Sequence, residues 1–371
     1  MFKFLNQQLS ILKNINLINK KKPKIIFYSE NESYQKYAYL LIKTLSREYP
    51  NQVYYVSSDK NDKIRNLNVN NLYIGKSILL QYFFLIISAE NIFFTLTDLN
   101  NHQIKKTKNV DNYIYYFHAP ASTTKVYTES AFDNFDTILC NGDYQIDEIR
   151  KRESLKNLTE KKLIKTGYFY FDYLKDKINN QVKADEILIA PSWNYKQKNF
   201  LNENIEAIIE NTLNKGFKVR FRPHPENLKR SKPFLNYLKY KFLNKNFIYD
   251  NQNENLEAME NAKCLITDSS GIAIEYILIF KKPVLYFDDV DKVHNPKFSQ
   301  FDNLITMDFK VKNKFGYIFK KNEINNIDLL INTALSEFIN KDSEIDNFIT
   351  QNFYNFGGTA NKFKENINKI F

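Results

Sequence analysis

In Cys264-Leu-Ile-Thr-Asp-Ser-Ser-Gly-Ile-Ala-Ile-Glu275, a run of apolar residues is followed by a turn of small residues and then by a helical pattern. The residues up to Thr267-Asp268 predict a buried strand, and Ser269, Ser270 and Gly271 predict a tight turn. A helix that begins directly after a buried strand is typical of a parallel α/β sheet. This stretch therefore predicts an α/β domain with the turn at the carboxyl edge of its sheet.

The same alternation of short apolar runs and helical stretches continues along the whole chain. Strands are expected at residues 24–28, 53–57, 91–99, 112–118, 136–140 and 163–167 and, after a polar stretch at 176–185, at 186–191, 217–223, 246–250, 263–268 and 283–289. Strands that are apolar on both faces and are separated by helices predict parallel sheets covered on both sides. Two such series imply two Rossmann-like, doubly wound domains that face each other across a cleft.

The polar stretch sets the expected domain boundaries. We expect a basic amphipathic leader at 1–22, an N-terminal Rossmann-like domain at 23–178 and a second one at 179–350. A last helix is expected within 351–371, after the Gly357-Gly358 break, and it can cross back to the N-terminal domain.

The composition excludes several classes of protein. A chain of 371 residues with 43% hydrophobic residues can form two cores, so it is not a disordered polymer. The two cysteines, Cys140 and Cys264, exclude a disulfide scaffold and a cysteine-built zinc cluster. The net charge of +11 suits anionic partners, but the lysines are dispersed and no nucleic-acid-binding motif is present. We therefore expect an anionic small molecule or membrane as partner, and no nucleic acid.

The chain carries six lysines within its first 24 residues, five of them in the leader, and no acidic residue precedes Glu30. It lacks the apolar core and cleavage site of a signal peptide, and no apolar run reaches the ~20 residues that span a bilayer. We therefore expect a cytoplasmic protein. The apolar residues of the leader can form one stripe above the lysines, as in a helix lying on the anionic inner face of the cell membrane. A solvated or partly packed helix is the alternative. The stripe consists of Phe2, Phe4, Leu5, Leu9, Ile11, Leu12 and Ile15.

The turn after Asp268 is the first candidate binding site. Free backbone N–H groups and the helix dipole favour an anion at a helix start, and the small side chains of Ser269, Ser270 and Gly271 let a phosphate approach. Glu275 lies further into the helix, where a carboxylate can accept hydrogen bonds from ribose hydroxyls. We expect a nucleotide phosphate here, and an ordinary serine-capped helix is the alternative.

The second candidate is Val219-Arg-Phe-Arg-Pro-His-Pro225. Arg220 and Arg222 alternate with Phe221, so both point to one face of the predicted strand. His224 is held between two prolines at the carboxyl end of this strand. Arg222 and His224 suit a diphosphate, with the imidazole as a hydrogen-bond donor or as an acid toward a leaving phosphate. An incidental loop histidine is the alternative.

The third candidate is Tyr116-Phe-His-Ala-Pro-Ala-Ser-Thr-Thr124, which closes a strand of the first series. His118 is a candidate base, because an imidazole with an ordinary pKa of about 6.5 can take a proton from an attacking hydroxyl at neutral pH. A histidine bonded to local backbone is the alternative. Ser122 and Thr123 are candidate acceptor-binding residues, and a helix cap is the plain interpretation.

Two further segments follow strands of the second series. Ser192 and Trp193 end the first of these strands and are candidates for the donor side. Trp193 can pack against a base or simply seal the domain. The acidic segment Phe287-Asp-Asp-Val-Asp291 resembles a metal-binding patch but has no supporting ligand cluster. We therefore expect no metal and no other cofactor.

Taken in order, these segments resemble the CDP-glycerol glycerophosphotransferase (teichoic-acid polymerase-like) family. The matching pieces are FHAPAST (117–123), AFDNFDTILCNGDYQIDEI (131–149), TGYFYFDYL (166–174), ILIAPSWN (187–194), VRFRPHPEN (219–227), ITDSSGIAIEYI (266–277) and FKKPVLYFDD (280–289), with a weaker echo in NFGGTANK (355–362). The resemblance implies an α/β fold of the GT-B type. In that fold, 23–178 would be the acceptor domain and 179–350 the nucleotide-donor domain.

The resemblance also implies an activity. Members of the family transfer glycerol phosphate, or a related polyol phosphate, from a CDP-activated donor to a hydroxyl of a polymer or lipid-linked acceptor, with release of CMP. By position, His118 resembles the proposed base and His224 the second essential histidine, on the donor diphosphate. Asp268, Ser269 and Ser270 fall in the family's phosphate-binding turn.

The chain departs from the family pattern in two motifs. It has His118-Ala-Pro-Ala-Ser-Thr where the family commonly has His-Gly-Thr-Pro-Leu-Lys, and Thr267-Asp-Ser-Ser-Gly271 where the family commonly has Thr-Asp-Tyr-Ser-Ser. These departures leave a second function open, a GT-B glycosyltransferase that uses a nucleotide-sugar donor in capsule or lipopolysaccharide synthesis. A third is a non-catalytic nucleotide-binding protein. The leaving nucleotide and the mass of the product separate the first two, and CDP binding without turnover would indicate the third.

Overall fold

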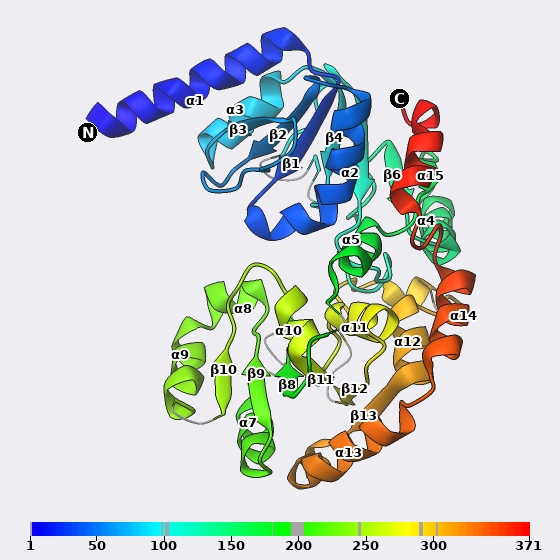
Figure 1. Ribbon diagram of the computed structural model, residues 1–371. Helices are drawn as coiled ribbons and strands as arrows, with labels where there is room; N and C mark the ends of the chain where they lie inside the picture. Colours follow the sequence, from blue (N-terminus) through cyan, green and yellow to red (C-terminus); the bar gives the residue numbers. More distant parts are fainter. Residues whose placement is uncertain are drawn as a thin grey trace. The chain divides into compact units, whose positions relative to one another are not determined.

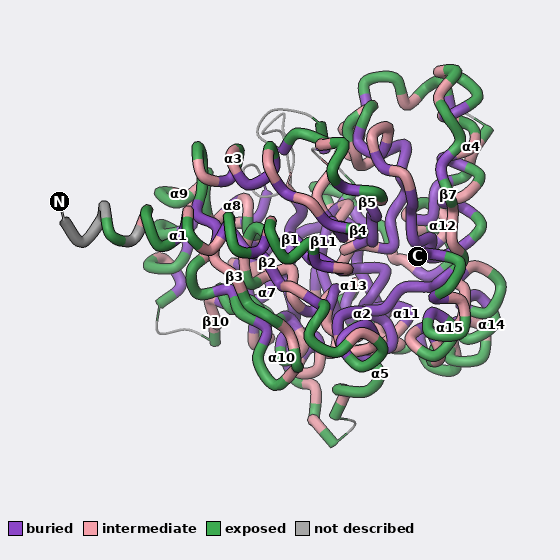
Figure 2. Tube along the Cα trace, turned by 90° about the horizontal axis from the view of Figure 1, so that it is seen from above, coloured by how far each residue is buried: buried purple, intermediate pink, exposed green. Residues whose placement is uncertain are grey.

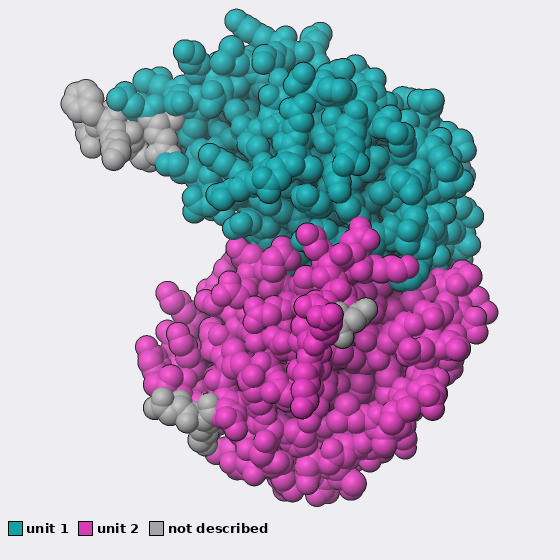
Figure 3. Space-filling model, in the orientation of Figure 1, with its two compact units in different colours: residues 1–118, 128–173, 353–371 teal, residues 119–127, 174–352 magenta. Residues whose placement is uncertain are grey.

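The computed structural model describes residues 2–97, 99–100, 104–179, 181–193, 204–243, 246–288, 292–301 and 303–371. The chain divides into two compact units, which Figure 3 distinguishes by colour. Unit 1 comprises residues 1–118, 128–173 and 353–371, and unit 2 comprises residues 119–127 and 174–352. Each unit contains one parallel sheet with helices on both faces, so the expected α/β class is confirmed.

Unit 1 is built on a seven-stranded parallel sheet with the order β3-β2-β1-β4-β5-β6-β7 (Figure 1). The strands are β1 (Ile25–Ser29), β2 (Val53–Ser57), β3 (Asn70–Tyr73), β4 (Ala89–Phe94), β5 (Val110–Tyr116), β6 (Thr137–Cys140) and β7 (Lys162–Lys165). The direction of winding reverses between β1 and β4. In doubly wound sheets, ligands bind at the carboxyl ends of the strands next to such a switch point.

Two helical layers cover this sheet. On one face, α2 (Gln35–Glu48) and the carboxyl-terminal elements α15 (Thr359–Glu365) and η4 (Ile367–Lys369) bury apolar side chains together with Phe27 and Phe93 of the sheet. On the other face, Phe84 of α3 (Ile78–Ile86) packs with its ring centroid 5.0 Å from Tyr28 and 5.7 Å from Phe94. The remaining helical elements are η1 (Glu32–Tyr34), α4 (Asp143–Lys156) and α5 (Phe169–Lys177).

The leader forms α1 (Phe2–Lys21), which packs on α3. Ile11 and Ile15 are buried in this packing, whereas Leu9 and Leu17 are exposed. The expected single exposed stripe is therefore wrong for Ile11 and Ile15, which fit the alternative of a partly packed helix. The side chains of Phe2, Phe4 and Leu5 lie outside the described residues. Within the part of the chain that the structure describes, no helix has the length and apolarity that crossing a bilayer requires.

Unit 2 is built on a six-stranded parallel sheet with the order β10-β9-β8-β11-β12-β13. The strands are β8 (Glu186–Ile189), β9 (Lys218–Phe221), β10 (Phe247–Tyr249), β11 (Ala262–Thr267), β12 (Val284–Phe287) and β13 (Gly316–Phe319). The switch point of this sheet lies between β8 and β11. Both strands are fully buried apart from Lys263, and Figure 2 shows the central strands largely in the colour of buried residues.

Helices again cover both faces of the second sheet. Ile208, Leu235 and Ile331 lie in one core cluster with sheet residues such as Ile187 and Phe221. Side chains of α11, such as Ile277, are also buried. The helical elements of unit 2 are α7 (Ile205–Asn214), α8 (Pro225–Arg230), α9 (Lys232–Lys241), α10 (Leu256–Asn261), α11 (Ile272–Phe280), η2 (Phe298–Phe301), α12 (Met307–Phe315), η3 (Lys321–Asn326), α13 (Ile327–Glu337) and α14 (Asp342–Asn352).

Two strands, β3 and β13, were not predicted from the sequence, and both are edge strands of their sheets. β3 has the sequence Asn-Asn-Leu-Tyr and is partly exposed, and β13 follows α12 without a connecting loop. A short edge strand needs neither two apolar faces nor a long apolar run. The pattern that reveals buried central strands is therefore absent from both.

Candidate functional site

The turn between β11 and α11 forms a set of free backbone donors. α11 begins at Ile272, and no side chain caps it. Within the described residues, the N–H groups of Ser269, Ser270, Gly271 and Ile272 donate no hydrogen bond, and all four residues are half-buried. Four free donors at the start of a nine-residue helix make a site suited to an anion.

The residues that open this turn are tied to the loop after β8. The carboxylate of Asp268 accepts two hydrogen bonds of 2.7 Å from Ser192, one from its backbone N–H and one from its hydroxyl. The Thr267 hydroxyl donates to the carbonyl oxygen of Ala190 at 2.6 Å, and the Asn227 amide donates to that of Ser192 at 3.2 Å. The structure thus joins Ser192 and Asp268 at the switch point of unit 2, and both side chains are buried.

His224 caps the amino end of α8, and its ring nitrogens have distinct roles. Nδ1 accepts a hydrogen bond of 3.1 Å from the backbone N–H of Glu226. Because a backbone N–H can only donate, Nδ1 holds a lone pair and the neutral imidazole carries its proton on Nε2. The half-buried ring can therefore offer an N–H donor.

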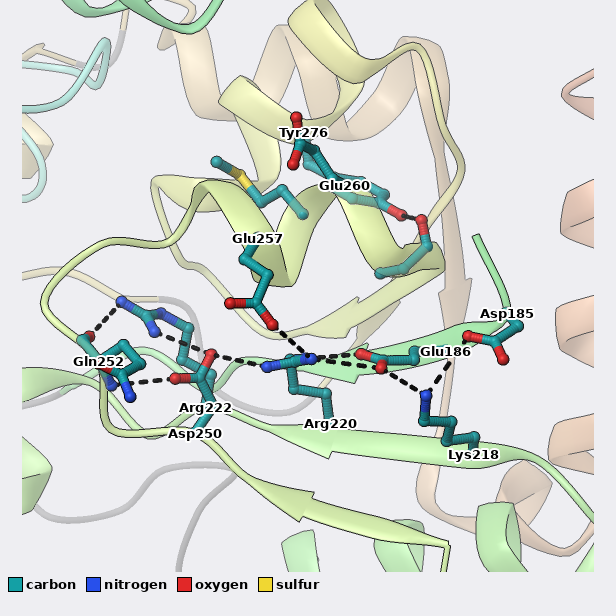
Figure 4. Close-up of polar contacts among 12 residues, drawn as sticks. Asp185, Glu186, Lys218, Arg220, Arg222, Asp250, Gln252, Glu257, Glu260 and Tyr276 are labelled. Carbon is teal, nitrogen blue, oxygen red and sulfur yellow. Dashed lines mark hydrogen bonds and ion pairs between the residues drawn. The ribbon is translucent and has the colours of Figure 1, made fainter. Parts of the chain in front are cut away.

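Arg220 of β9 and Arg222, which directly follows this strand, both approach the carboxylate of Asp250 (Figure 4). Arg222 Nη1 lies 3.0 Å from Asp250 Oδ2, and its Nη2 donates to the carbonyl oxygen of Gln252 at 2.8 Å. Arg220 pairs with Glu186 at 2.6 Å. Arg222 thus contacts two residues of the loop after β10 and helps to order that loop.

The pKa of Glu186 shows how strong this network is. Burial alone would raise this pKa, but hydrogen bonds from Arg220 and Lys218 hold it below its usual value. Removing one member of such a buried cluster leaves an uncompensated charge, which is strongly destabilising. The network is therefore part of the scaffold under the candidate site.

Two predicted donor-side residues are packed within unit 2. The ring of Trp193 lies 5.8 Å from the ring of His294, and the guanidinium of Arg230 lies 5.3 Å from the Trp193 ring centroid. Glu275 is almost fully buried on α11, with 3% of its side chain exposed. The packing of Trp193 matches the sealing role that the sequence left open.

His118 follows β5 in unit 1, and its neighbours determine which ring nitrogen carries the proton. Its Nδ1 lies 3.0 Å from both the carbonyl oxygen and the hydroxyl of Thr95, which directly follows β4. A carbonyl oxygen can only accept, so Nδ1 carries the proton and Nε2 holds the lone pair. The rings of Tyr34 and Tyr37 lie edge-on to the imidazole, with centroids 5.6 and 6.0 Å away.

A buried carboxylate, that of Asp62, braces this part of unit 1, and no sequence pattern indicated it. Asp62 accepts hydrogen bonds from the hydroxyls of Ser29 and Ser57, both at 2.7 Å, and from the amide of Gln35 at 2.5 Å. Ser29 and Ser57 end β1 and β2, and Gln35 opens α2 directly after Tyr34. Asp62 therefore fixes the segment that places Tyr34 beside His118.

The chain passes from unit 1 to unit 2 directly after His118, so Ser122 and Thr123 belong to unit 2. Both are buried. The Ser122 hydroxyl accepts from the backbone N–H groups of Thr124 and Lys125, at 3.3 and 3.2 Å, which is the local bonding of the capping interpretation. In the same segment, the Cβ of Ala119 lies 3.5 Å from the position that a Cβ on Gly271 would take.

Three titratable groups near this segment were missed by the sequence analysis. Asp308 Oδ2 accepts from the backbone N–H of Ser122 at 3.4 Å, and burial raises the pKa of this carboxyl. Burial also lowers the pKa of Lys292, and burial together with the charge of Lys292 lowers the pKa of His294 to about 4. Each is a single residue in a polar segment, and only the tertiary fold brings them together.

No group of three or more His, Cys, Asp or Glu side chains that could hold a metal ion occurs within the described ranges. Of the acidic segment after β12, Asp288 is described and exposed. Asp289 and Asp291 lie outside the described residues, so the absence of a metal site remains a prediction.

Comparison with known families gives one match that covers most of the chain. The model of the family described as CDP-glycerol:poly(glycerophosphate) glycerophosphotransferase matches residues 11–302. No curated protein matches the sequence.

Several solved structures are similar to the chain. The wall teichoic acid polymerase TagF has a TM-score of 0.64 and 16% identity, covering 100% of this chain and 98% of that one. S. aureus MnaA, solved with UDP, has a TM-score of 0.59 and 12% identity, covering 94% and 96%. The UDP-GlcNAc 2-epimerase of Methanocaldococcus jannaschii, solved with UDP-GlcNAc and UDP, has a TM-score of 0.58 and 15% identity, covering 93% and 99%. These likenesses confirm the GT-B type of fold.

Proposed function

The chain belongs to the CDP-glycerol:poly(glycerophosphate) glycerophosphotransferase family, and we propose that it transfers glycerol phosphate, or a related polyol phosphate, from a CDP-activated donor to a hydroxyl of a surface polysaccharide or teichoic-acid-like acceptor. CMP is the other product. The observation that carries the proposal is the set of free N–H groups at Ser269–Ile272, beside the switch point of unit 2. In this proposal, domain 23–178 takes the acceptor and domain 179–350 takes the donor.

The donor diphosphate lies on the start of α11 in this proposal. The N–H groups of Ser269, Ser270 and Gly271 donate to its oxygens, where the helix dipole also favours negative charge. Asp268 keeps the turn in place through its two hydrogen bonds to Ser192. A histidine-to-asparagine variant of TagF has been solved after a soak with CDPG, and we propose the same kind of donor here.

Other predicted donor residues have supporting roles. His224 donates its Nε2–H to a phosphate oxygen and stabilises the charge that develops on the leaving CMP. Arg222 orders the loop after β10 through Asp250 and Gln252. Glu275 and Trp193 remain the proposed partners of the ribose and the base.

His118 activates the acceptor. Its Nε2 takes the proton of the attacking hydroxyl, the hydroxyl oxygen bonds to the phosphorus distal to cytidine, and the bond from that phosphorus to the CMP oxygen breaks. Within unit 2, Ala119, the residue after His118 in the sequence, packs beside Gly271 of the turn at 269–271. Ser122 and Thr123 hold the chain just beyond this point and remain the proposed acceptor-side residues.

Thermal stabilisation by nucleotides tests the donor class. A ligand at 100 times its dissociation constant adds nearly ~3 kcal/mol to the free energy of unfolding. We expect CDP-glycerol or CDP-ribitol to raise the melting temperature, and UDP-sugars and CMP-sugars to leave it unchanged. A rise with UDP-sugars alone would favour the nucleotide-sugar glycosyltransferase instead.

A turnover assay tests the reaction itself. The protein is incubated with CDP-glycerol and a synthetic glycerol phosphate oligomer. The release of CMP is then measured, and the mass of the oligomer is determined by mass spectrometry. We expect CMP release together with a mass increase of one glycerol phosphate. Binding of CDP-glycerol without either change, over a panel of hydroxyl acceptors, would indicate a non-catalytic binding protein.

A peripheral membrane site for the acceptor is a second part of the proposal. α1 exposes Lys13, Lys20 and Lys21 together with Leu9 and Leu17. Exposed lysines beside exposed leucines suit an anionic lipid surface, where each lysine contributes ~1 kcal/mol. We therefore expect the protein to sediment with phosphatidylcholine vesicles that contain phosphatidylglycerol, and not with phosphatidylcholine alone.

A matched pair of variants tests the membrane proposal. Replacing Lys13, Lys20 and Lys21 by glutamine removes three charges from α1 and should weaken vesicle binding roughly 100-fold. The control removes three exposed lysines elsewhere in unit 1, Lys60, Lys63 and Lys108. Equal binding by the two triple variants would contradict a role for α1.

A further inference from the structure

Lys292 lies on a segment that hydrogen bonds fasten to residues 124–126 within unit 2. The backbone N–H of His294 donates to the carbonyl oxygen of Lys125 at 2.9 Å, and His294 Nδ1 donates to that of Val126 at 3.0 Å. The amide of Asn295 donates to the carbonyl oxygen of Thr124 at 2.8 Å. The backbone next to Lys292 is thus fixed.

The segment 119–127, to which the residues after Lys292 are hydrogen-bonded, begins beside the turn at 269–271. Residues 119–127 form one continuous piece of unit 2, and Ala119 at its start packs beside Gly271. Asp268, which opens the same turn, acts electrostatically on Lys292. The ring of His294, two residues after Lys292, also lies 5.8 Å from the ring of Trp193, which directly follows Ser192, the residue that binds Asp268. This packing, together with the charge of Asp268, places the segment of Lys292 near the turn at 269–271.

Lys292 is a half-buried cation whose nearby carboxylates are held by other groups. The charges of Asp268 and Asp308 both act on it, but Asp268 accepts from Ser192 and Asp308 accepts from the backbone of Ser122. Within the described residues, Lys292 makes no hydrogen bond and no ion pair. A cation that is partly removed from water without a partner is unfavourable until an anion binds it.

We propose that Lys292 binds the diphosphate of the nucleotide donor, adding the positive charge that the free N–H groups at 269–272 lack. This inference rests on the proposed function. The predicted cation, Arg222, is paired with Asp250 and donates to Gln252, so part of its charge is already compensated within the protein. A lysine ammonium suits the task because it binds phosphate as a compact point charge.

The test compares nucleotides that differ only in their phosphates. Dissociation constants of CDP, CMP and cytidine are measured by calorimetry for the wild type, Lys292→Met and Lys292→Arg. Losing one charge-assisted hydrogen bond should weaken CDP binding by about 10- to 100-fold in Lys292→Met, while cytidine binding stays unchanged. Lys292→Arg keeps the charge and should stay within a few-fold of the wild type.

Lys297→Met is the matched control, because Lys297 is exposed and lies five positions along the same segment. It makes the same change of charge and should leave CDP binding unchanged. A loss that is equal for CDP and cytidine in Lys292→Met, or equal in the two methionine variants, would overturn the inference, as would unchanged CDP binding in Lys292→Met.

The outcomes separate this inference from the proposed function. If the wild type binds CDP and Lys292→Met binds it equally well, only the role of Lys292 falls. If the wild type binds neither CDP nor CDP-glycerol, the proposed function falls and the inference falls with it. A weaker CMP complex in Lys292→Met supports the inference and indicates contact with the phosphate nearest the ribose.

Discussion

His118 and His224 both stand just beyond the carboxyl end of a strand, but their Nδ1 atoms face opposite partners. Nδ1 of His118 meets a carbonyl oxygen, that of Thr95, and Nδ1 of His224 meets a backbone N–H, that of Glu226. The first histidine is left with a lone pair on Nε2 and the second with an N–H. One backbone atom next to each ring thus decides which histidine can accept a proton and which can donate one.

The largest effect is expected from His118→Ala, which removes the proposed base. Turnover should fall by ~10²–10⁴, because no other group takes the hydroxyl proton, while the dissociation constant of CDP stays unchanged. CMP release at saturating CDP-glycerol and calorimetry with CDP measure the two quantities. Turnover near that of the wild type in a folded variant would show that the lone pair of His118 is not used.

His224 can be tested with its helix cap and its Nε2–H separated. His224→Ala loses both, and should lower turnover by ~10²–10⁴ and stability by ~1 kcal/mol. His224→Asn keeps a side-chain oxygen that can cap α8 but has no imidazole. We expect the asparagine variant to match the wild type in urea unfolding and the alanine variant in lost turnover. An asparagine variant with normal turnover would reduce His224 to a cap.

His294 offers a contrast, since burial keeps its pKa at about 4, below the 6.5 of an unfolded imidazole. As the pH falls from about 6.5 to about 4, the unfolded chain binds a proton that the folded chain does not. The stabilisation is therefore complete above this window and is lost through it, by less than the full pKa difference implies because solvent partly screens the half-buried ring. Urea unfolding at several pH values should show this loss in the wild type and a smaller one in His294→Gln. Equal slopes in both proteins would show that another group carries the effect.

The smallest effect concerns Thr95, whose hydroxyl is a second partner for Nδ1 of His118. Thr95→Val removes this hydroxyl and keeps the carbonyl, so turnover should fall roughly 3- to 10-fold with little change in the KM for CDP-glycerol. Thr95→Ser restores the hydroxyl and should restore turnover. If the serine variant is as slow as the valine variant, the methyl group rather than the hydroxyl positions the ring.

The sequence was sufficient for the central strands and for the turn at 269–271, because both are local patterns, whereas phosphate binding at this turn stays a prediction. The apolar runs of β1 and β11, and the small residues at 269–271, are visible without knowledge of any distant partner. The domain boundaries at 22, 178 and 350 and the cleft between the domains stay predictions.

The partners of the site residues could not be predicted. Asp268 bonds to a residue 76 positions earlier, and Arg222 pairs with Asp250 on the loop after the next strand. Lys292 lies in no recognisable motif, and its position is set by hydrogen bonds between the neighbouring residues and the segment at 124–126. Hydrogen bonds between distant parts of the chain leave no periodic signal in the sequence. The site residues could therefore be predicted by type, but their hydrogen-bond partners could not.

The interleaved path of the chain has a consequence for biosynthesis. Phe363, Ile367 and Ile370 belong to the core around the first sheet, although they are synthesised after unit 2. All of unit 2 is therefore synthesised before these residues can cover the first sheet. Until then, the apolar face of that sheet stays exposed in the nascent chain. Chaperones are therefore expected to bind mainly to the incomplete unit 1 during translation.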